Sequence, residues 1–88
     1  MPSYLVETYL ARCRSGDRAA YEERARAAAG ELTRAGTRVR FDGVIHVPED
    51  ETCFFVFDAP SSRVAASVAE RAALDPLRVV EAVTSREE

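Results

Sequence analysis

Two hydrophobic periodicities alternate along the chain. Apolar residues recur at every second position, or run together, in four segments, which predicts strands at 4–10, 38–47, 52–58 and 78–84. After the first and third of these segments they recur at helical spacing, which predicts one helix ending at Gly36 and another running from Ser61 or Ser62 to a stop before Pro76. The order βαββαβ predicts a ferredoxin-like α+β sandwich. Its antiparallel sheet has the first and third strands in the centre, and both helices cover one face.

The third predicted strand is apolar on both of its faces. Phe54 to Phe57 are four consecutive apolar residues, whereas a strand with one face in water usually alternates apolar and polar residues. Fully burying a Phe contributes about 1.5–3 kcal/mol, so leaving two of them in water would be costly. We therefore expect a second copy of the chain to cover the open face of the sheet. In this homodimer Phe55 would line the interface, and Phe55→Glu would dissociate or unfold the protein.

The turn between the second and third predicted strands determines which side chains share a face. We expect residues 48–51, which are polar and begin with Pro48, to form this turn. Counting back from this turn places three cross-strand pairs on one face of the sheet: His46 with Cys53, Val44 with Phe55, and Asp42 with Phe57. Two further pairs lie on the other face: Ile45 with Phe54, and Gly43 with Val56.

Composition and charge exclude several classes of function. A chain of 88 residues is one domain, 1–88, with about residues 1–3 and 85–88 expected as frayed ends. The net charge is −3 and the 12 basic residues are all Arg and are scattered, so we expect no nucleic-acid partner and no lysine Schiff base. No signal-type segment and no apolar run of about 18 residues is present, so we expect a cytoplasmic protein without a membrane partner.

A histidine and two cysteines are the candidate metal ligands. His46 is the only imidazole, and Cys53 and Cys13 are expected near the same end of the sheet. An imidazole and two thiolates suit Zn²⁺ or another borderline-soft ion. Three alternatives remain open: a Cys–His nucleophilic pair at residues 46 and 53, a Cys13–Cys53 disulfide, and a purely structural role in which both cysteines are free thiols.

Two acidic residues, on the first and last predicted strands, are candidates to line a cavity between subunits. Glu7 and Glu81 are each flanked by apolar residues on strands that should be neighbours. We expect both carboxylates on the open face, where they could bind a cation or act as acid or base, with Val6, Val80 and Ala82 toward the helices. The structural alternative is an ion pair with Arg38 or Arg40, and Arg40 is therefore included among the cavity residues.

Five short motifs resemble a small bacterial family of unknown function that is typified by a nickel-binding ferredoxin-like protein. The motifs are Tyr4-Leu5-Val6-Glu7, Val44-Ile45-His46, Phe57-Asp58-Ala59-Pro60, Ala69-Glu70-Arg71-Ala72 and Arg78-Val79-Val80-Glu81. The resemblance implies a dimer and a divalent metal, nickel or zinc, with His46 as the ligand that carries over directly. Family members often have a second His where this chain has Val68, and a Cys where it has Phe55.

Two classes of function follow from these features. The first is a small dimeric binding protein that holds a divalent metal ion or small molecule near the cavity between the two sheets. The second is a dimeric α/β-barrel enzyme, of the small cyclase, isomerase or cofactor-free monooxygenase type, which shares the fold class. The few catalytic-type side chains and the several potential ligands favour the binding protein.

Overall fold

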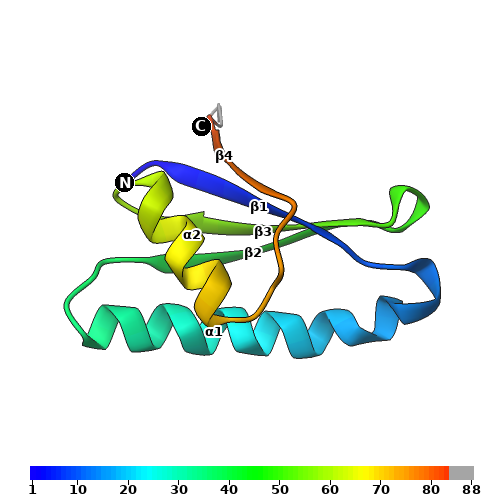
Figure 1. Cartoon of the computed structure of the whole chain (residues 1–88), viewed down its shortest axis with the longest axis horizontal. Helices are drawn as coiled ribbons and strands as arrows, with labels where there is room; N and C mark the ends of the chain where they lie inside the picture. Colours follow the sequence, from blue (N-terminus) through cyan, green and yellow to red (C-terminus); the bar gives the residue numbers. More distant parts are fainter. Residues whose placement is uncertain (84–88) are drawn as a thin grey trace, which may run out of the picture.

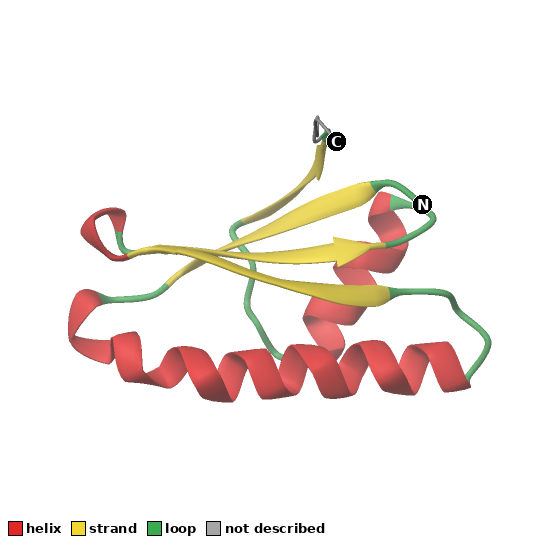
Figure 2. Cartoon of the chain, turned by 180° about the vertical axis from the view of Figure 1, so that it is seen from behind, coloured by secondary structure: helices red, strands yellow, loops and turns green. Residues whose placement is uncertain are grey.

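A computed structural model describes residues 1–83 and confirms the ferredoxin-like fold. The strands and helices follow in this order: β1 Ser3–Tyr9, α1 Arg18–Arg34, β2 Arg40–Val47, β3 Thr52–Asp58, α2 Ser62–Arg71 and β4 Arg78–Ala82. The sheet has the order β2-β3-β1-β4 and every neighbouring pair is antiparallel. Both helices lie on the same side of the sheet, α1 beneath β2 and α2 beneath β1 and β4 (Figures 1 and 2).

Helix α1 packs closely on the sheet because the residues that it buries are small. Ala25, Ala28 and Ala29 face the core, and a methyl group keeps the helix backbone near the strands. The helix ends as expected at Gly36, which has a φ of 102°, a conformation that suits glycine. The segment before the helix forms a 3₁₀ turn, Arg12–Asp17.

Helix α2 begins where the pattern predicted and ends earlier. The hydroxyl of Ser61 accepts a hydrogen bond from the backbone N–H of Val64 at 3.3 Å, as an N-cap does. The helix ends at Arg71, and Ala73 takes a left-handed conformation with a φ of 56°. The guanidinium of Arg24 in α1 donates to the carbonyls of residues 72 and 73, at 2.8 and 2.9 Å. A tertiary contact therefore supports this helix end, which lacks the glycine that would mark it in a sequence.

The predicted register between β2 and β3 is confirmed except at one end. His46 lies opposite Cys53 and Gly43 opposite Val56, as counted from the turn. Phe57, however, lies opposite Phe41 and not Asp42, because a β-bulge interrupts the ladder between Phe41 and Gly43. The bulge turns the ring of Phe41 toward the core and leaves Asp42 at the open side of the sheet.

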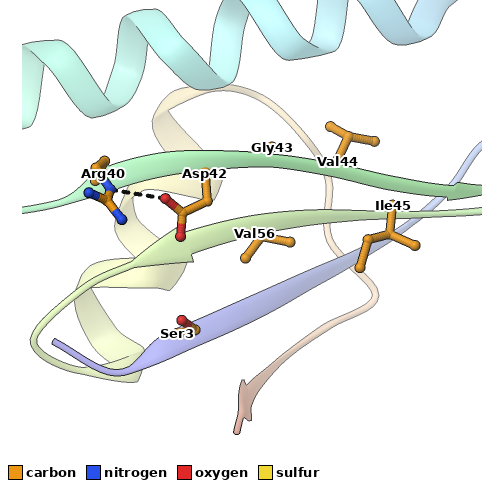
Figure 3. A pocket seen from close by; sticks show the side chains of 7 residues that line it. All are labelled: Ser3, Arg40, Asp42, Gly43, Val44, Ile45 and Val56. Atoms are coloured by element: carbon orange, nitrogen blue, oxygen red, sulfur yellow. Dashed lines mark hydrogen bonds and ion pairs between the residues drawn. The ribbon is translucent and has the colours of Figure 1, made fainter. Parts of the chain in front are cut away.

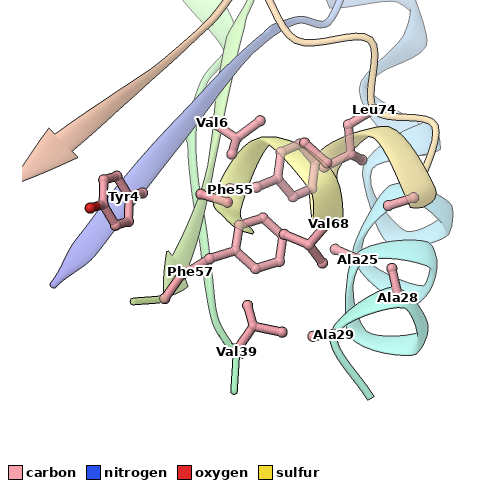
Figure 4. Close-up of a cluster of buried hydrophobic side chains, with 14 of the residues drawn as sticks. Tyr4, Val6, Ala25, Ala28, Ala29, Val39, Phe55, Phe57, Val68 and Leu74 are labelled. Carbon is pink, nitrogen blue, oxygen red and sulfur yellow. The ribbon is translucent and has the colours of Figure 1, made fainter. Parts of the chain in front are cut away.

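The hydrophobic core lies between the sheet and the helices and contains Phe55, which corrects the expectation that this residue lines a dimer cavity. Phe55 and Phe57 are fully buried, and Figure 4 shows both rings pointing toward α1 and α2. The ring of Phe55 meets that of Tyr21 edge-on at 6.5 Å between centroids. Because residues alternate along a strand, Phe54 and Val56 are the β3 residues on the open face.

Strands β1 and β4 lie near the two ends of the described chain. Ser3 is the first residue of β1, and the carbonyl of Pro2 accepts a hydrogen bond from the N–H of Ala59 at 3.0 Å, so these residues are tied to the fold. Strand β4 ends at Ala82, and the predicted strand residue Thr84 and tail 85–88 lie outside the described residues. No helix within residues 1–83 is long and apolar enough to cross a membrane.

Candidate functional site

His46 and Cys53 lie side by side, on the helix-covered face of the sheet. They are direct cross-strand partners, and Cys53 is fully buried. Nδ1 of His46 is 3.4 Å from Nη1 of Arg18, at the start of α1. The other ring nitrogen, Nε2, is buried and has no hydrogen-bond partner among residues 1–83. His46 is thus held against the first turn of α1 and does not point into the space that a second sheet would cover.

The predicted metal trio of His46, Cys53 and Cys13 does not fit a metal centre. Burial raises the pKa of the Cys53 thiol to about 11, which disfavours the free thiolate that a nucleophile needs. Cys13 is an exposed free thiol on the 3₁₀ turn. Among the described residues, no three His, Cys, Asp or Glu side chains gather closely enough to hold a metal ion. The unpartnered Nε2 of His46 is the one feature of the trio that would suit a ligand.

The two acidic cavity candidates lie on opposite faces of the sheet. Glu7 is paired with Phe54 and lies on the open face, as expected, where its Oε1 is 2.6 Å from Nε of Arg78. Glu81 is paired with buried Tyr4, so it lies on the helix side, contrary to expectation. Val80 and Ala82 consequently lie on the open face, because the register of β4 is shifted by one residue from the predicted arrangement. The partner of Glu7 is Arg78, and neither Arg38 nor Arg40.

The open face of the sheet carries an apolar strip across all four strands. Its members are Leu5, Ile45, Phe54, Val56 and Val80. Four of the five are partly exposed, and Ile45 is 52% exposed. No helix of the described chain covers this strip (Figure 2). The strip is therefore the face of β3 and its neighbouring strands that the helices leave uncovered.

A polar corner adjoins one end of the apolar strip. It consists of Ser3 on β1, Arg40 and Asp42 on β2, and Asp58 on β3. Arg40 donates to Asp42 at 2.9 Å and to Asp58 at 2.7 Å, and the hydroxyl of Ser3 donates to Asp58 at 2.8 Å. A hollow of about 350 Å³ opens here, lined by Ser3, Arg40 and Asp42 of the corner and by Ile45 and Val56 of the strip (Figure 3).

The pKa values of the two carboxyl groups of the polar corner are shifted in opposite directions. Burial, together with the hydrogen bond and negative charge of Asp58, raises the pKa of Asp42 above its ordinary value. Burial also acts to raise the pKa of Asp58, but hydrogen bonds from Ser3 and Asp42 and the charge of Arg40 outweigh it and lower that pKa. The corner therefore holds one readily ionised carboxylate beside one that retains its proton to higher pH.

Sequence patterns identified only part of this corner. Arg40 was a candidate because of its charge, whereas Ser3, Asp42 and Asp58 were not. Asp42 was assigned to the face of Phe57, and only the bulge after Phe41 brings it beside Asp58. A glycine in the middle of a strand is a recognised sign of a bulge, and Gly43, with a φ of 145°, was the available signal.

Comparison with known proteins supports the fold and does not identify a ligand. No family model and no curated protein matches the sequence. Among solved structures, the chain is similar to SCO4226 from Streptomyces coelicolor A3(2), known from its crystal structure analysis, with a TM-score of 0.76. The match covers 96% of this chain and 99% of that chain, at 16% sequence identity. Identity this low shows a common fold, and so the chain is similar to SCO4226 as a whole ferredoxin-like domain.

Proposed function

We propose that the protein is a homodimeric binding protein that holds a divalent metal ion or a small molecule between two open sheet faces, at the polar corner. The observation that carries the proposal is the position of the hollow. Paired carboxyl groups, Asp42 and Asp58, lie directly beside an uncovered apolar strip. An apolar surface that excludes water next to a few convergent polar groups is the usual composition of a ligand site.

The apolar strip supports the dimer, and its size predicts the strength of association. Strands about 4.8 Å apart with about 3.3 Å per residue give this face a footprint on the order of 400 Å². Stable interfaces bury about 800 Å² on each partner, so a dimer through this face alone lies at the weak end of specific association. We expect a dimer whose population depends on concentration in the micromolar range, and a ligand held by both copies would strengthen it.

The polar corner supports a ligand that competes with Arg40. Its guanidinium now occupies the oxygens of both Asp42 and Asp58, and its own side chain is 71% exposed, so it can swing into solvent at little cost. A divalent cation or a small molecule with amino or hydroxyl donors would take its place on the carboxylate oxygens. Oxygen ligands of this kind suit hard cations and are also found at zinc sites.

His46 supports a second location for a metal, separate from the polar corner. Its Nε2 lacks a partner, and its sequence context resembles that of the nickel-binding family. Because His46 faces the helices, binding there would not depend on the dimer. The two locations are therefore distinguishable by mutation.

Metal analysis and thermal shifts test the proposal. Untagged protein is examined for bound metal, and the melting temperature is measured with Ni²⁺ and Zn²⁺ for wild type, Asp58→Asn and His46→Ala. We expect metal to raise the melting temperature of wild type and of His46→Ala, and to do little for Asp58→Asn. A shift lost only in His46→Ala would place the metal at the imidazole and refute the polar corner as the metal site.

The enzyme alternative uses the same hollow. Two neighbouring carboxyl groups whose pKa values are shifted in opposite directions are candidates for a general acid and a general base. Under this alternative Asp42→Asn would still bind the small molecule and would lose turnover. Under the binding proposal no turnover exists to lose, and the substitution changes affinity alone.

A further inference from the structure

A second hollow lies between α1 and β2, on the helix side of the sheet. It has a volume of about 500 Å³. Its floor is apolar, formed by the buried residues Ala29 and Val39 and the ring of Phe41, and its rim carries Arg26 and Arg34. Strand β2 is an outer strand of the sheet, so the groove opens to solvent along one edge of the molecule.

Gly30 keeps this groove open at the middle of α1. It lies between the two rim arginines, one turn from each, and a glycine in a helix interior costs stability that an alanine would not. An added Cβ would lie 3.4 Å from Nη1 of Arg34, in ordinary contact, so the backbone tolerates a methyl group at this position. The methyl would nevertheless occupy the space between the helix and the guanidinium of Arg34.

Three arginines line the groove: Arg40 pairs with the two carboxylates of the polar corner, and the other two are only weakly engaged. The guanidinium of Arg34 lines the groove and makes no hydrogen bond or ion pair with other side chains within residues 1–83. The guanidinium of Arg26 lies 5.7 Å from the centroid of the Phe41 ring and bonds Glu23 at 2.9 Å, in an ion pair whose members are both mostly exposed. Such pairs contribute little and exchange readily with other anions. No carboxylate lines the groove, whereas the chain as a whole has a net charge of −3.

The walls of the groove are fixed before any ligand arrives. The hydroxyl of Thr33 donates to the carbonyl of Val39 at 2.9 Å and ties the last turn of α1 to the segment entering β2. The bulge after Phe41 interrupts the regular outer edge of β2, which disfavours the addition of a peptide strand there. A compact ligand fits this geometry better than an extended chain.

We propose that this groove binds a small amphipathic anion, with a flat apolar body against Phe41 and Val39 and a carboxylate or phosphate held by Arg34 and Arg26. Guanidinium groups pair with such anions through two parallel hydrogen bonds, and an aromatic floor receives the apolar body. The groove lies on the helix side of the sheet and shares only Arg40 with the polar corner, and it does not require the dimer.

Binding of three matched probes tests this site. The perturbation of backbone amide NMR signals is measured on the intact protein. The probes are 2-naphthyl phosphate, 2-naphthoate and 2-naphthol. We expect one or both anions to bind and to perturb residues of α1 and β2, and the neutral naphthol to bind at least about five-fold more weakly. A preference for the phosphate or for the carboxylate identifies the anion. Equal binding of naphthol, or no binding of either anion, would overturn the proposal.

Two substitutions and two controls locate the binding. Arg34→Gln should weaken anion binding by about 5- to 10-fold, while Arg63→Gln, an exposed arginine on α2, should not. Gly30→Ala should raise the melting temperature by about 4–8 °C and still weaken binding. Phe54→Glu, designed to break the dimer, should bind like wild type, so this proposal can fail or succeed independently of the proposed function. Unchanged binding in both Arg34→Gln and Gly30→Ala would remove the groove as the site.

Discussion

The two faces of the sheet are built from the same strands and differ in what covers them. On the helix face, Val6, Phe55 and Phe57 are completely buried beneath α1 and α2. On the open face, Leu5, Phe54 and Val56 occupy the alternate positions and keep part of their surface in water. Both faces are apolar at the centre of the sheet, yet only one has a covering layer within the chain.

This difference indicates how a consecutive apolar run in a strand should be interpreted. In a sheet with one wet face, half of the residues of β3 should be polar, but only Thr52 and Asp58, at its two ends, are polar. The helix face uses its apolar residues for folding. The open face retains similar residues with no such use in the monomer, and a second copy of the chain is the partner that we propose for them.

The largest effect is expected from a charge placed on the helix face. Phe55→Glu would bury a carboxylate in the apolar core, beside the rings of Tyr21 and Phe41. Removing a buried Phe alone costs about 3–5 kcal/mol, and the unpaired charge adds to it, against a total stability of about 5–15 kcal/mol. We expect an unfolded protein by circular dichroism. A folded, dissociated protein would show that Phe55 belongs to the interface after all.

The same substitution one residue earlier should separate folding from association. Phe54→Glu places its carboxylate on the open face, where the monomer leaves it in water. We expect a native circular dichroism spectrum and a loss of dimer at concentrations where wild type associates. Phe54→Leu, which keeps the apolar surface, is the matched control and should remain dimeric. An unfolded Phe54→Glu protein would mean that the open face is needed for the fold itself.

The polar corner should respond to pH in opposite directions at its two carboxyl groups. The lowered pKa of Asp58 stabilises the folded state above the unfolded pKa near 3.8, and this contribution is lost as pH falls through the folded value. The raised pKa of Asp42 acts in the reverse sense, because its contribution is full below that unfolded pKa and is lost as pH rises through the folded value.

These opposite pKa shifts predict opposite effects of the two Asp→Asn substitutions on stability. At pH 7, Asp58→Asn should lower the free energy of unfolding, and Asp42→Asn should leave it equal or raise it. Each change should be no more than about 1 kcal/mol. Both differences from wild type should shrink as the pH approaches 3. Urea titrations at pH 7 and pH 3 would measure them, and equal destabilisation by the two substitutions at pH 7 would contradict the assignment of charge in the corner.

The smallest effect is expected from the ion pair elsewhere on the open face. Glu7 bonds Arg78, whose side chain is 66% exposed, and exposed pairs contribute about 0.2–1 kcal/mol. Glu7→Gln should therefore change the stability of the monomer very little in urea titrations. A larger effect on dimerisation than on folding would place the pair inside the interface, and a loss of several kcal/mol in the monomer would show a role in folding that the structure does not explain.

The fold was predictable because its determinants are local. Strand β3 was bounded at the same residues in sequence and structure, and the register of His46 with Cys53 followed from the length of the turn alone. The end of α2 was not predictable, because it depends on the contact between Arg24 and the carbonyls of residues 72 and 73. That contact joins positions almost fifty residues apart.

The candidate site was predictable only in part, because a shift of one residue moves a side chain to the other face. The bulge moved Phe41 into the core and Asp42 beside Asp58, and the register of β4 placed Glu81 on the helix side. Glu7 was correctly anticipated on the open face, because β1 alternates without interruption, whereas Arg40 pairs with Asp42 and Asp58 and not with the expected glutamates. His46 and Cys53 were correctly expected to be cross-strand partners, whereas Cys13 was grouped with them only because it should lie near the same end of the sheet, with no spacing that fixes its position.

Sedimentation equilibrium of wild type and Phe54→Glu, at matched micromolar concentrations, tests the central claim that the open face is an interface. We predict a wild-type mass of twice the 9.7 kDa of the chain and a Phe54→Glu mass equal to it. A wild type that remains monomeric across this range, or a Phe54→Glu protein that is dimeric like wild type, would contradict the account.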